Sequence, residues 1–147
     1  MKILFTQSPL IASRLIRKIT GEPVSHCAIE IDGTVIHSNF LGVHPQSAEG
    51  FRDHCTVWGE VPFPDDFKKM FEQTCAGWGR RYDFGALLYL ALRYLLPWLP
   101  KKNLWQTSGM YLCSEWVSSY FGEEDAMITP YRLYLKLGGV DKKVADA

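Results

Sequence analysis

Residues 25–39 have the sequence SHCAIEIDGTVIHSN, and this stretch decides the fold of the chain. Two runs rich in β-branched side chains, 26–31 and 34–38, flank the dipeptide Asp32-Gly33. An Asp-Gly pair between two such runs is the strongest short-range signal for a β-hairpin with a two-residue turn. The stretch therefore predicts two antiparallel strands of a small sheet.

The same hairpin carries two histidines whose rings we expect to meet. If Ile31 pairs with Thr34 across the turn, His37 lies opposite Ala28, on the sheet face that also holds His26. Two histidines two positions apart on one face can serve as a general base and its orienting group. The alternative is that both are ordinary surface histidines.

Cys113 begins a second informative segment, residues 113–121, which has helical spacing. Trp116, Val117 and Tyr120 share one helical face with Cys113, and this apolar face must turn toward the sheet. A thiol at a helix N-terminus lies beside unpaired N–H groups that favour the reactive thiolate and can receive an oxyanion. The alternative is that Cys113 is one more small buried residue.

The rest of the chain predicts a single α+β domain, residues 1–147, in which helices pack against a small antiparallel sheet. Residues 39–54 are expected to be an irregular connection, and residues 139–147 a flexible tail. Apolar periodicity and turn signals predict the remaining elements. They are strands at 2–6 and 55–61, and helices at 8–20, 64–78, 84–96 and 129–137.

Composition excludes several classes of protein. Apolar residues make up 47% of the chain and charged residues 22%, with a formal net charge of zero, so no basic field indicates nucleic acid binding. The first residues lack the pattern of a signal peptide, and no apolar run is long enough to span a membrane. We therefore expect a cytoplasmic chain whose four cysteines are thiols.

Four short motifs, taken in order, resemble the circularly permuted NlpC-like branch of the papain-like cysteine hydrolases, which includes relatives of lecithin retinol acyltransferase. The resemblance covers roughly residues 24–121. The motifs are Ser25-His26-Cys27-Ala28-Ile29-Glu30, Gly33-Thr34-Val35-Ile36-His37, Tyr82-Asp83-Phe84 and Cys113-Ser114-Glu115. In unpermuted members of the group the tyrosine motif and the cysteine come before the histidine, whereas here the histidine hairpin comes first.

The resemblance implies a role for each matching residue. Cys113 corresponds to the nucleophile, His26 to the general base and His37 to the third residue of the triad, with Glu30 as the alternative third residue. Tyr82 corresponds to a tyrosine beside the catalytic cysteine. By the same comparison, backbone N–H groups at Cys113 and Ser114 would stabilise the oxyanion.

The expected function is hydrolysis of a peptide or amide bond, including cell-wall peptides, through a thioester intermediate and without a metal or organic cofactor. One alternative is an acyltransferase or thioesterase-like enzyme that acts on fatty-acyl lipids. The other is a non-catalytic binding module that keeps the papain-like fold.

The segment 84–105 bears on this choice because its helix is apolar on nearly every side. It can pack inside the domain, form a dimer contact or form a peripheral membrane contact with Arg93, Lys101 and Lys102 near the headgroups. If it walls an acyl site, side chains such as Leu88, Leu92, Trp98 and Trp105 should line a groove that leads to the cysteine.

Overall fold

The computed structural model describes residues 1–64, 66–100, 102, 104–108, 110–122 and 128–141. These residues form an α+β fold with a five-stranded antiparallel sheet in the order β4-β3-β2-β1-β5. The strands are β1 (Lys2–Gln7), β2 (His26–Ile31), β3 (Thr34–Asn39), β4 (Gly42–Ser47) and β5 (Thr56–Pro62).

The central hairpin matches the prediction from the Asp32-Gly33 turn. Ile31 pairs with Thr34, and the ladder continues to the pair Ile29 and Ile36. Both turn residues adopt positive φ angles, 44° at Asp32 and 80° at Gly33. Since such angles are those of a two-residue hairpin turn that matches the twist of its strands, the turn fixes the register of β2 against β3.

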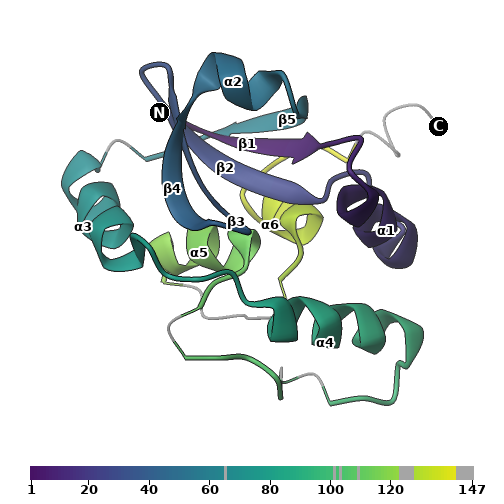
Figure 1. The fold of residues 1–147 in the computed structure, drawn as a ribbon. Coiled ribbons are helices and arrows are strands. Elements are labelled where there is room, and N and C mark those ends of the chain that lie inside the picture. Colours follow the sequence, from purple (N-terminus) through teal and green to yellow (C-terminus); the bar gives the residue numbers. More distant parts are fainter. Residues whose placement is uncertain (65, 101, 103, 109, 123–127, 142–147) are drawn as a thin grey trace.

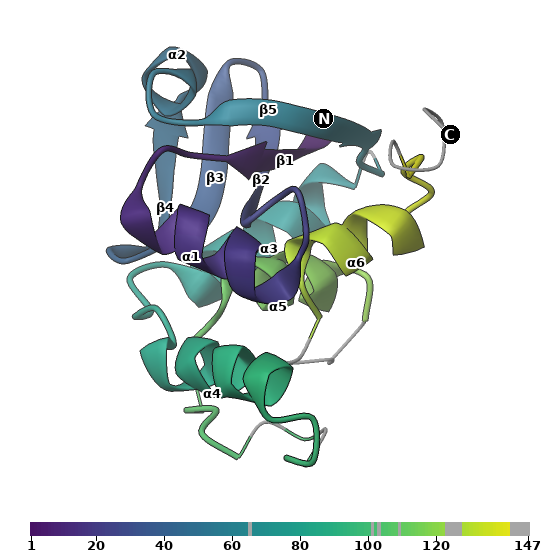
Figure 2. The same ribbon diagram turned by 90° about the vertical axis from the view of Figure 1, so that its right-hand side faces the viewer.

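Six helices lie around the sheet in the part of the chain that the structure describes. Figure 1 shows α2 above the sheet and α5 and α6 below it, and Figure 2 shows α4 farthest from the sheet, beneath α1. The helices are α1 (Ile11–Thr20), α2 (Ala48–Arg52), α3 (Phe67–Gly77), α4 (Phe84–Leu95), α5 (Cys113–Tyr120) and α6 (Pro130–Lys136).

Both faces of the sheet are covered. One face packs against α5 and α6 and contributes Phe5, Cys27 and Ile29 to a cluster that includes Trp116 and Val117. The predicted core face of β2 and the predicted inward face of α5 therefore meet in this cluster. The other face, which holds Ala28, is also buried, beneath Phe51 and its neighbours on α2. His26 is only partly buried because it lies at the start of β2, at the end of this second cluster.

The prediction of an irregular connection over residues 39–54 was wrong, because this stretch forms β4 and α2. Its sequence, GVHPQS in β4, carries a glycine and a proline, both of which weaken a strand signal. Proline is tolerated here because β4 is the edge strand of the sheet. Ser47 caps α2 by accepting a hydrogen bond from the Gly50 N–H.

The first helix also differs from its prediction. It begins at Ile11, later than the predicted start at residue 8, and the Ser8 N–H donates to Ser13 Oγ at 3.0 Å. Two of its apolar side chains are largely uncovered, since Ile11 is 83% exposed and Leu15 54% exposed. The helix ends before Gly21, which has a φ of 69°.

The apolar helix α4 begins after Asp83, which accepts a hydrogen bond from the Ala86 N–H. It buries Ala86, Tyr89 and Leu90 and leaves Phe84, Leu88 and Leu95 exposed, so its all-round apolar sequence is only partly explained by burial. None of the helices in the described part of the chain has the length and apolar character needed to span a bilayer. The tail predicted over 139–147 lies beyond the described residues from position 142 onward.

Gly42 is the glycine on which the sheet edge depends most strongly. It has a φ of 91°, and a Cβ atom there would clash with the backbone carbonyl oxygen of Arg80. We predict that Gly42→Ala lowers the free energy of unfolding by about 2 kcal/mol or more, because strain and overpacking add. Urea denaturation measures this. Gly138→Ala is the control. Gly138 has a φ of 88°, and a Cβ atom added there would have no heavy atom within 4 Å, so this substitution should lower the free energy of unfolding by only about 1 kcal/mol. Equal losses in the two variants would contradict the packing argument.

Candidate active site

The rings of His26 and His37 meet at the open end of the central hairpin. His26 Nε2 lies 2.9 Å from His37 Nδ1, a hydrogen-bond distance, and the ring planes are inclined at 77°. The predicted contact between the two histidines is therefore confirmed, and it follows from the register that the Asp-Gly turn imposes. Because Nε2 of His26 faces His37, its Nδ1 is the nitrogen left for a second partner.

Cys113, the first residue of α5, lies close to His26. Its thiol is almost fully buried, with 4% of the residue exposed, and Cys27 and His26 both lower the pKa of the thiol. As the first helical residue it lies among the N–H groups that have no acceptor within the helix. The structure thus brings together the three residues that the sequence singled out.

Several polar contacts hold the start of α5 against the hairpin. Ser38 Oγ on β3 donates to the Tyr111 carbonyl at 3.1 Å, and Tyr111 forms a short parallel bridge with Tyr82. The Leu112 N–H donates to Glu115 Oε2 at 3.3 Å, which satisfies one donor at the helix start. Glu115 therefore supports the helix start, while Ser38 connects that helix to the strand that carries His37.

Cys27 is the nearest thiol neighbour of Cys113, a relation that the sequence did not reveal. Its S–H and its backbone N–H lie close to the Cys113 sulfur and stabilise the thiolate form. These donors, chiefly the Cys27 side chain, together with the charge of His26, hold the pKa of Cys113 well below its usual value despite burial. Burial raises the pKa of Cys27 itself, so Cys27 remains a thiol that can donate.

His37 is neutral at ordinary pH. Burial, followed by the charges of His26 and His44, lowers the pKa of His37 to about 3. A neutral His37 can accept a hydrogen bond at Nδ1 from a protonated His26 when its own proton sits on Nε2. That Nε2 atom is buried without a hydrogen-bond partner among the described residues; the side chain of Gln46 lies nearby, outside good hydrogen-bond geometry, and tends to raise the pKa of His37.

Tyr82 and Ser114 lie beside this cluster in different ways. Tyr82 is 9% exposed, and burial, followed by the charge of Cys113, raises the pKa of its phenol, so the hydroxyl stays protonated and can donate. The hydroxyl of Ser114 is already engaged, donating to the Ile128 carbonyl at 2.7 Å. Ser114 can therefore contribute its backbone N–H, but not its hydroxyl, to binding an oxyanion.

Glu30, the alternative orienting residue, lies away from the histidines. Its Oε2 atom is 2.7 Å from Arg52 Nη2 and 3.6 Å from Lys2 Nζ, at the far end of β2 from His26. The guanidinium of Arg52 lowers the pKa of this carboxyl group. Glu30 thus connects α2 to the sheet. The contact with His26, for which Glu30 was the alternative, is made by His37.

An apolar cavity of about 260 Å³ opens beside His26, His37 and Tyr82. Its walls come mainly from α1, the β3–β4 turn, α2 and its following loop, whereas α4 contributes Leu87. The side chains that would line the groove if this helix walled an acyl site, Leu88, Leu92, Trp98 and Trp105, do not line this cavity, so that conditional prediction is not met here. The other lining residues are Ser8, Leu10, Ala12, Ser13, Ile16, Ser25, Ser38, Asn39, Phe40, Gln46, Phe51, His54 and Cys55.

Removing the Cys27 side chain should raise the pKa of Cys113. In Cys27→Ala the largest stabilising contact of the thiolate is lost, so we expect labelling of Cys113 by iodoacetamide near pH 6.5 to slow by roughly several-fold. Cys27→Ser keeps a donor and should label nearly as the natural protein does. Mass spectrometry of the Cys113 peptide across a pH series measures the shift. An unchanged profile in Cys27→Ala would show that Cys27 does not stabilise the thiolate.

Comparison with known proteins adds no assignment. No protein-family model matches the chain, and no curated protein matches it. Within the described residues, no group of three or more histidine, cysteine, aspartate or glutamate side chains is arranged to hold a metal ion. The geometry of the site residues is therefore the basis for assigning a function.

Proposed function

We propose that the protein is a cysteine hydrolase that cleaves an acyl bond through a thioester, with Cys113 as nucleophile, His26 as general base and His37 as orienting residue. The observation that carries the proposal is the placement of His26 between the other two: His26 Nε2 lies 2.9 Å from His37 Nδ1, and Cys27 and His26 both lower the pKa of the buried Cys113 thiol. A nucleophile, a base and an orienter in hydrogen-bond contact are the signature of covalent acyl transfer.

We further propose that the fold is that of the permuted papain-like hydrolases. The five-stranded antiparallel sheet, the histidine pair on the hairpin and the cysteine at the start of α5 are what that resemblance leads one to expect. The order of the chain agrees with the permuted arrangement, since the histidine hairpin precedes the helix that carries the cysteine.

The reaction would proceed in two stages. His26 takes the thiol proton, and the imidazolium donates from Nε2 to the neutral His37. The thiolate of Cys113 attacks the carbonyl carbon, the N–H groups at the start of α5 receive the oxyanion, and His26 returns its proton to the leaving amine or alkoxide. His26 then deprotonates a water molecule, whose oxygen attacks the thioester carbonyl and frees the carboxylic acid and the Cys113 thiol.

The first form of this proposal follows from the sequence: the enzyme cleaves a peptide or amide bond. One structural observation favours the second candidate, hydrolysis or transfer of a fatty-acyl group. The cavity beside His26 is walled chiefly by apolar side chains such as Leu10, Ile16 and Phe51, and such walls suit a hydrocarbon chain better than a polar peptide. The third candidate, a binding module, predicts an unreactive Cys113.

A substrate panel separates the candidates. Short-chain and long-chain p-nitrophenyl esters, long-chain fatty amides and cell-wall-type peptides are each offered to the natural protein and to Cys113→Ser. Turnover of peptides supports the peptidase form, and turnover confined to long-chain esters or amides supports the acyl form. In either case the activity should vanish in Cys113→Ser. No turnover combined with an unreactive Cys113 would overturn the hydrolase proposal.

A further inference from the structure

Helix α1 exposes apolar side chains that a water-soluble helix ordinarily buries. Ile11 is 83% exposed, Leu10 just before the helix 59% and Leu15 54%. Ile11 and Leu15 lie on the outer side of α1, whose opposite side packs toward α4 and toward the residue before β2, where Ser13 bonds to Ser25 at 2.6 Å. Clustered exposed apolar residues of this size mark an interaction surface.

The apolar surface continues from α1 across the mouth of the cavity. Leu10 and Phe40 both line the cavity and are both more than half exposed, so they stand at its opening. Phe40 stacks on Phe84 with ring centroids 5.6 Å apart and planes inclined by 6°. Leu41 is 80% exposed and shares a shallow hollow with both rings. We call this set the docking face: Leu10, Ile11, Leu15, Phe40, Leu41 and Phe84.

The exposed charges that border the docking face are positive. Arg14 and Lys18 share a hollow with Ile11 and Leu15, and Arg81 shares one with Leu41 and Phe84. Among the described residues none of these three cations forms a salt bridge.

Acidic groups, by contrast, are scarce on this face. Helix α1 contains no acidic residue, and Asp83, next to Phe84, is 1% exposed and occupied by the Ala86 and Thr107 N–H groups.

We propose that the docking face binds the surface of an anionic lipid membrane, with its apolar side chains inserted at the boundary between headgroups and acyl chains. Exposed Leu, Ile and Phe beside unpaired Arg and Lys are the composition that binds such a boundary, where the cations contact the phosphates. A protein partner would be expected to offer carboxylates to these cations and would close the cavity. A lipid surface instead leaves the cavity mouth open toward acyl chains. The use of this opening by a substrate rests on the proposed function.

Vesicle flotation tests the docking face without any substrate. The full chain is mixed with vesicles of phosphatidylcholine alone or with roughly one third phosphatidylglycerol. We expect binding to the anionic vesicles that weakens at high salt. The double variant Ile11→Glu, Leu15→Glu should bind at least about tenfold more weakly, because it places two carboxylates in the apolar part of the face. Cys113→Ala should bind as the natural protein does, so loss of the hydrolase function does not affect this test.

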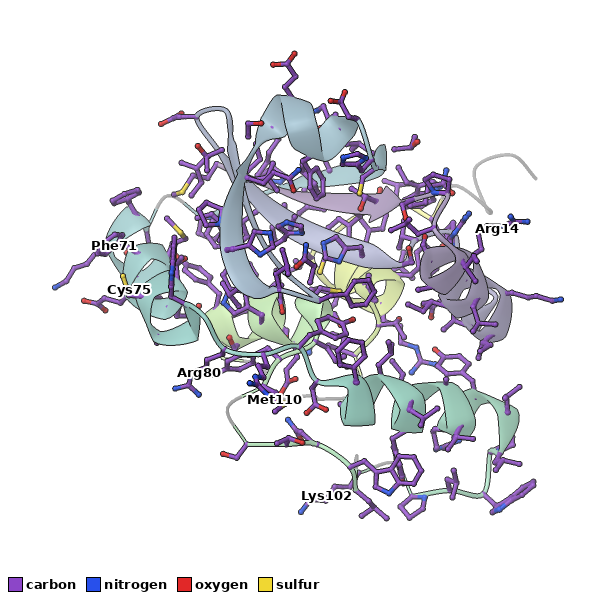
Figure 3. All side chains as sticks on the ribbon, viewed as in Figure 1. Arg14, Phe71, Cys75, Arg80, Lys102 and Met110 are labelled. Atoms are coloured by element: carbon purple, nitrogen blue, oxygen red, sulfur yellow. The ribbon has the colours of Figure 1, made fainter. Side chains whose placement is uncertain are left out.

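Phe71→Glu is the matched control. Phe71 is 56% exposed on α3, and Figure 3 shows it on the opposite side of the molecule from Arg14. This variant should keep vesicle binding. Equal loss of binding in Phe71→Glu, or no binding by the natural chain to anionic vesicles, would overturn the proposal. So would light scattering that shows a dimer broken by the Ile11 and Leu15 changes, since the face would then join two copies of the chain.

Discussion

Replacing Cys113 with serine is expected to lower turnover of any substrate found in the panel by at least about a thousandfold. The thiolate is the group that attacks, and a serine hydroxyl in the same place would need a far stronger base to ionise. The change should leave the fold intact, because Cys113 is a small residue at the start of α5 and serine fits the same position. Circular dichroism and thermal melting check the fold, and steady-state kinetics measure the loss.

The same prediction has a covalent readout. With a slow ester substrate the natural protein should accumulate an acyl group on the Cys113 peptide, which mass spectrometry detects. Cys75 provides an internal control, since it is an exposed cysteine on α3, away from the histidines. Acylation of Cys75 alone, with activity retained in Cys113→Ser, would show that another group performs the chemistry.

Replacing His26 with alanine is expected to lower turnover by about 10²–10⁴-fold, the usual contribution of a general base. It should also slow labelling of Cys113 near pH 6.5, because, after Cys27, His26 is the group that lowers the pKa of this thiol. The matched control is His54→Ala. His54 also borders the cavity but is exposed, and it is not among the groups that shift the pKa of Cys113.

His37→Ala should give a smaller loss than His26→Ala, because His37 acts through the orientation of His26 and does not touch the thiol. The pH profile separates these roles. His37 is neutral above its pKa of about 3, so its removal should lower the rate across the profile without adding a new ionisation. If His37→Ala equals His26→Ala in its effect and the protein remains folded, His37 has a more direct part than we assign to it.

The sequence predicted the site residues better than the walls around them. The Asp32-Gly33 turn determines the register of the hairpin, and the register places His26 beside His37. The helical spacing from Cys113 to Tyr120 correctly places the cysteine at the inner start of α5. Both are local signals, in which the geometry follows from a few neighbouring residues.

The cavity walls and the thiol pair depend on packing between distant segments, which a single sequence does not display. Cys27 lies next to Cys113 because α5 packs across β2, and the sequence of neither segment predicts that contact. The cavity draws its walls from α1 and the β3–β4 turn, although the apolar sequence of α4 pointed elsewhere. Strand β4 was not predicted because its glycine and proline are residues typical of loops.

The pH dependence of alkylation tests the central claim, an activated Cys113 thiol, most directly. The natural protein is treated with iodoacetamide from about pH 5.5 to 9, and mass spectrometry follows labelling of all four cysteines. We predict that Cys113, although only 4% exposed, labels faster than the exposed Cys75 at about pH 6.5, because its pKa is held low by Cys27 and His26. Labelling of Cys113 that lags behind Cys75 at every pH, and begins only above about pH 8.5, would contradict the claim.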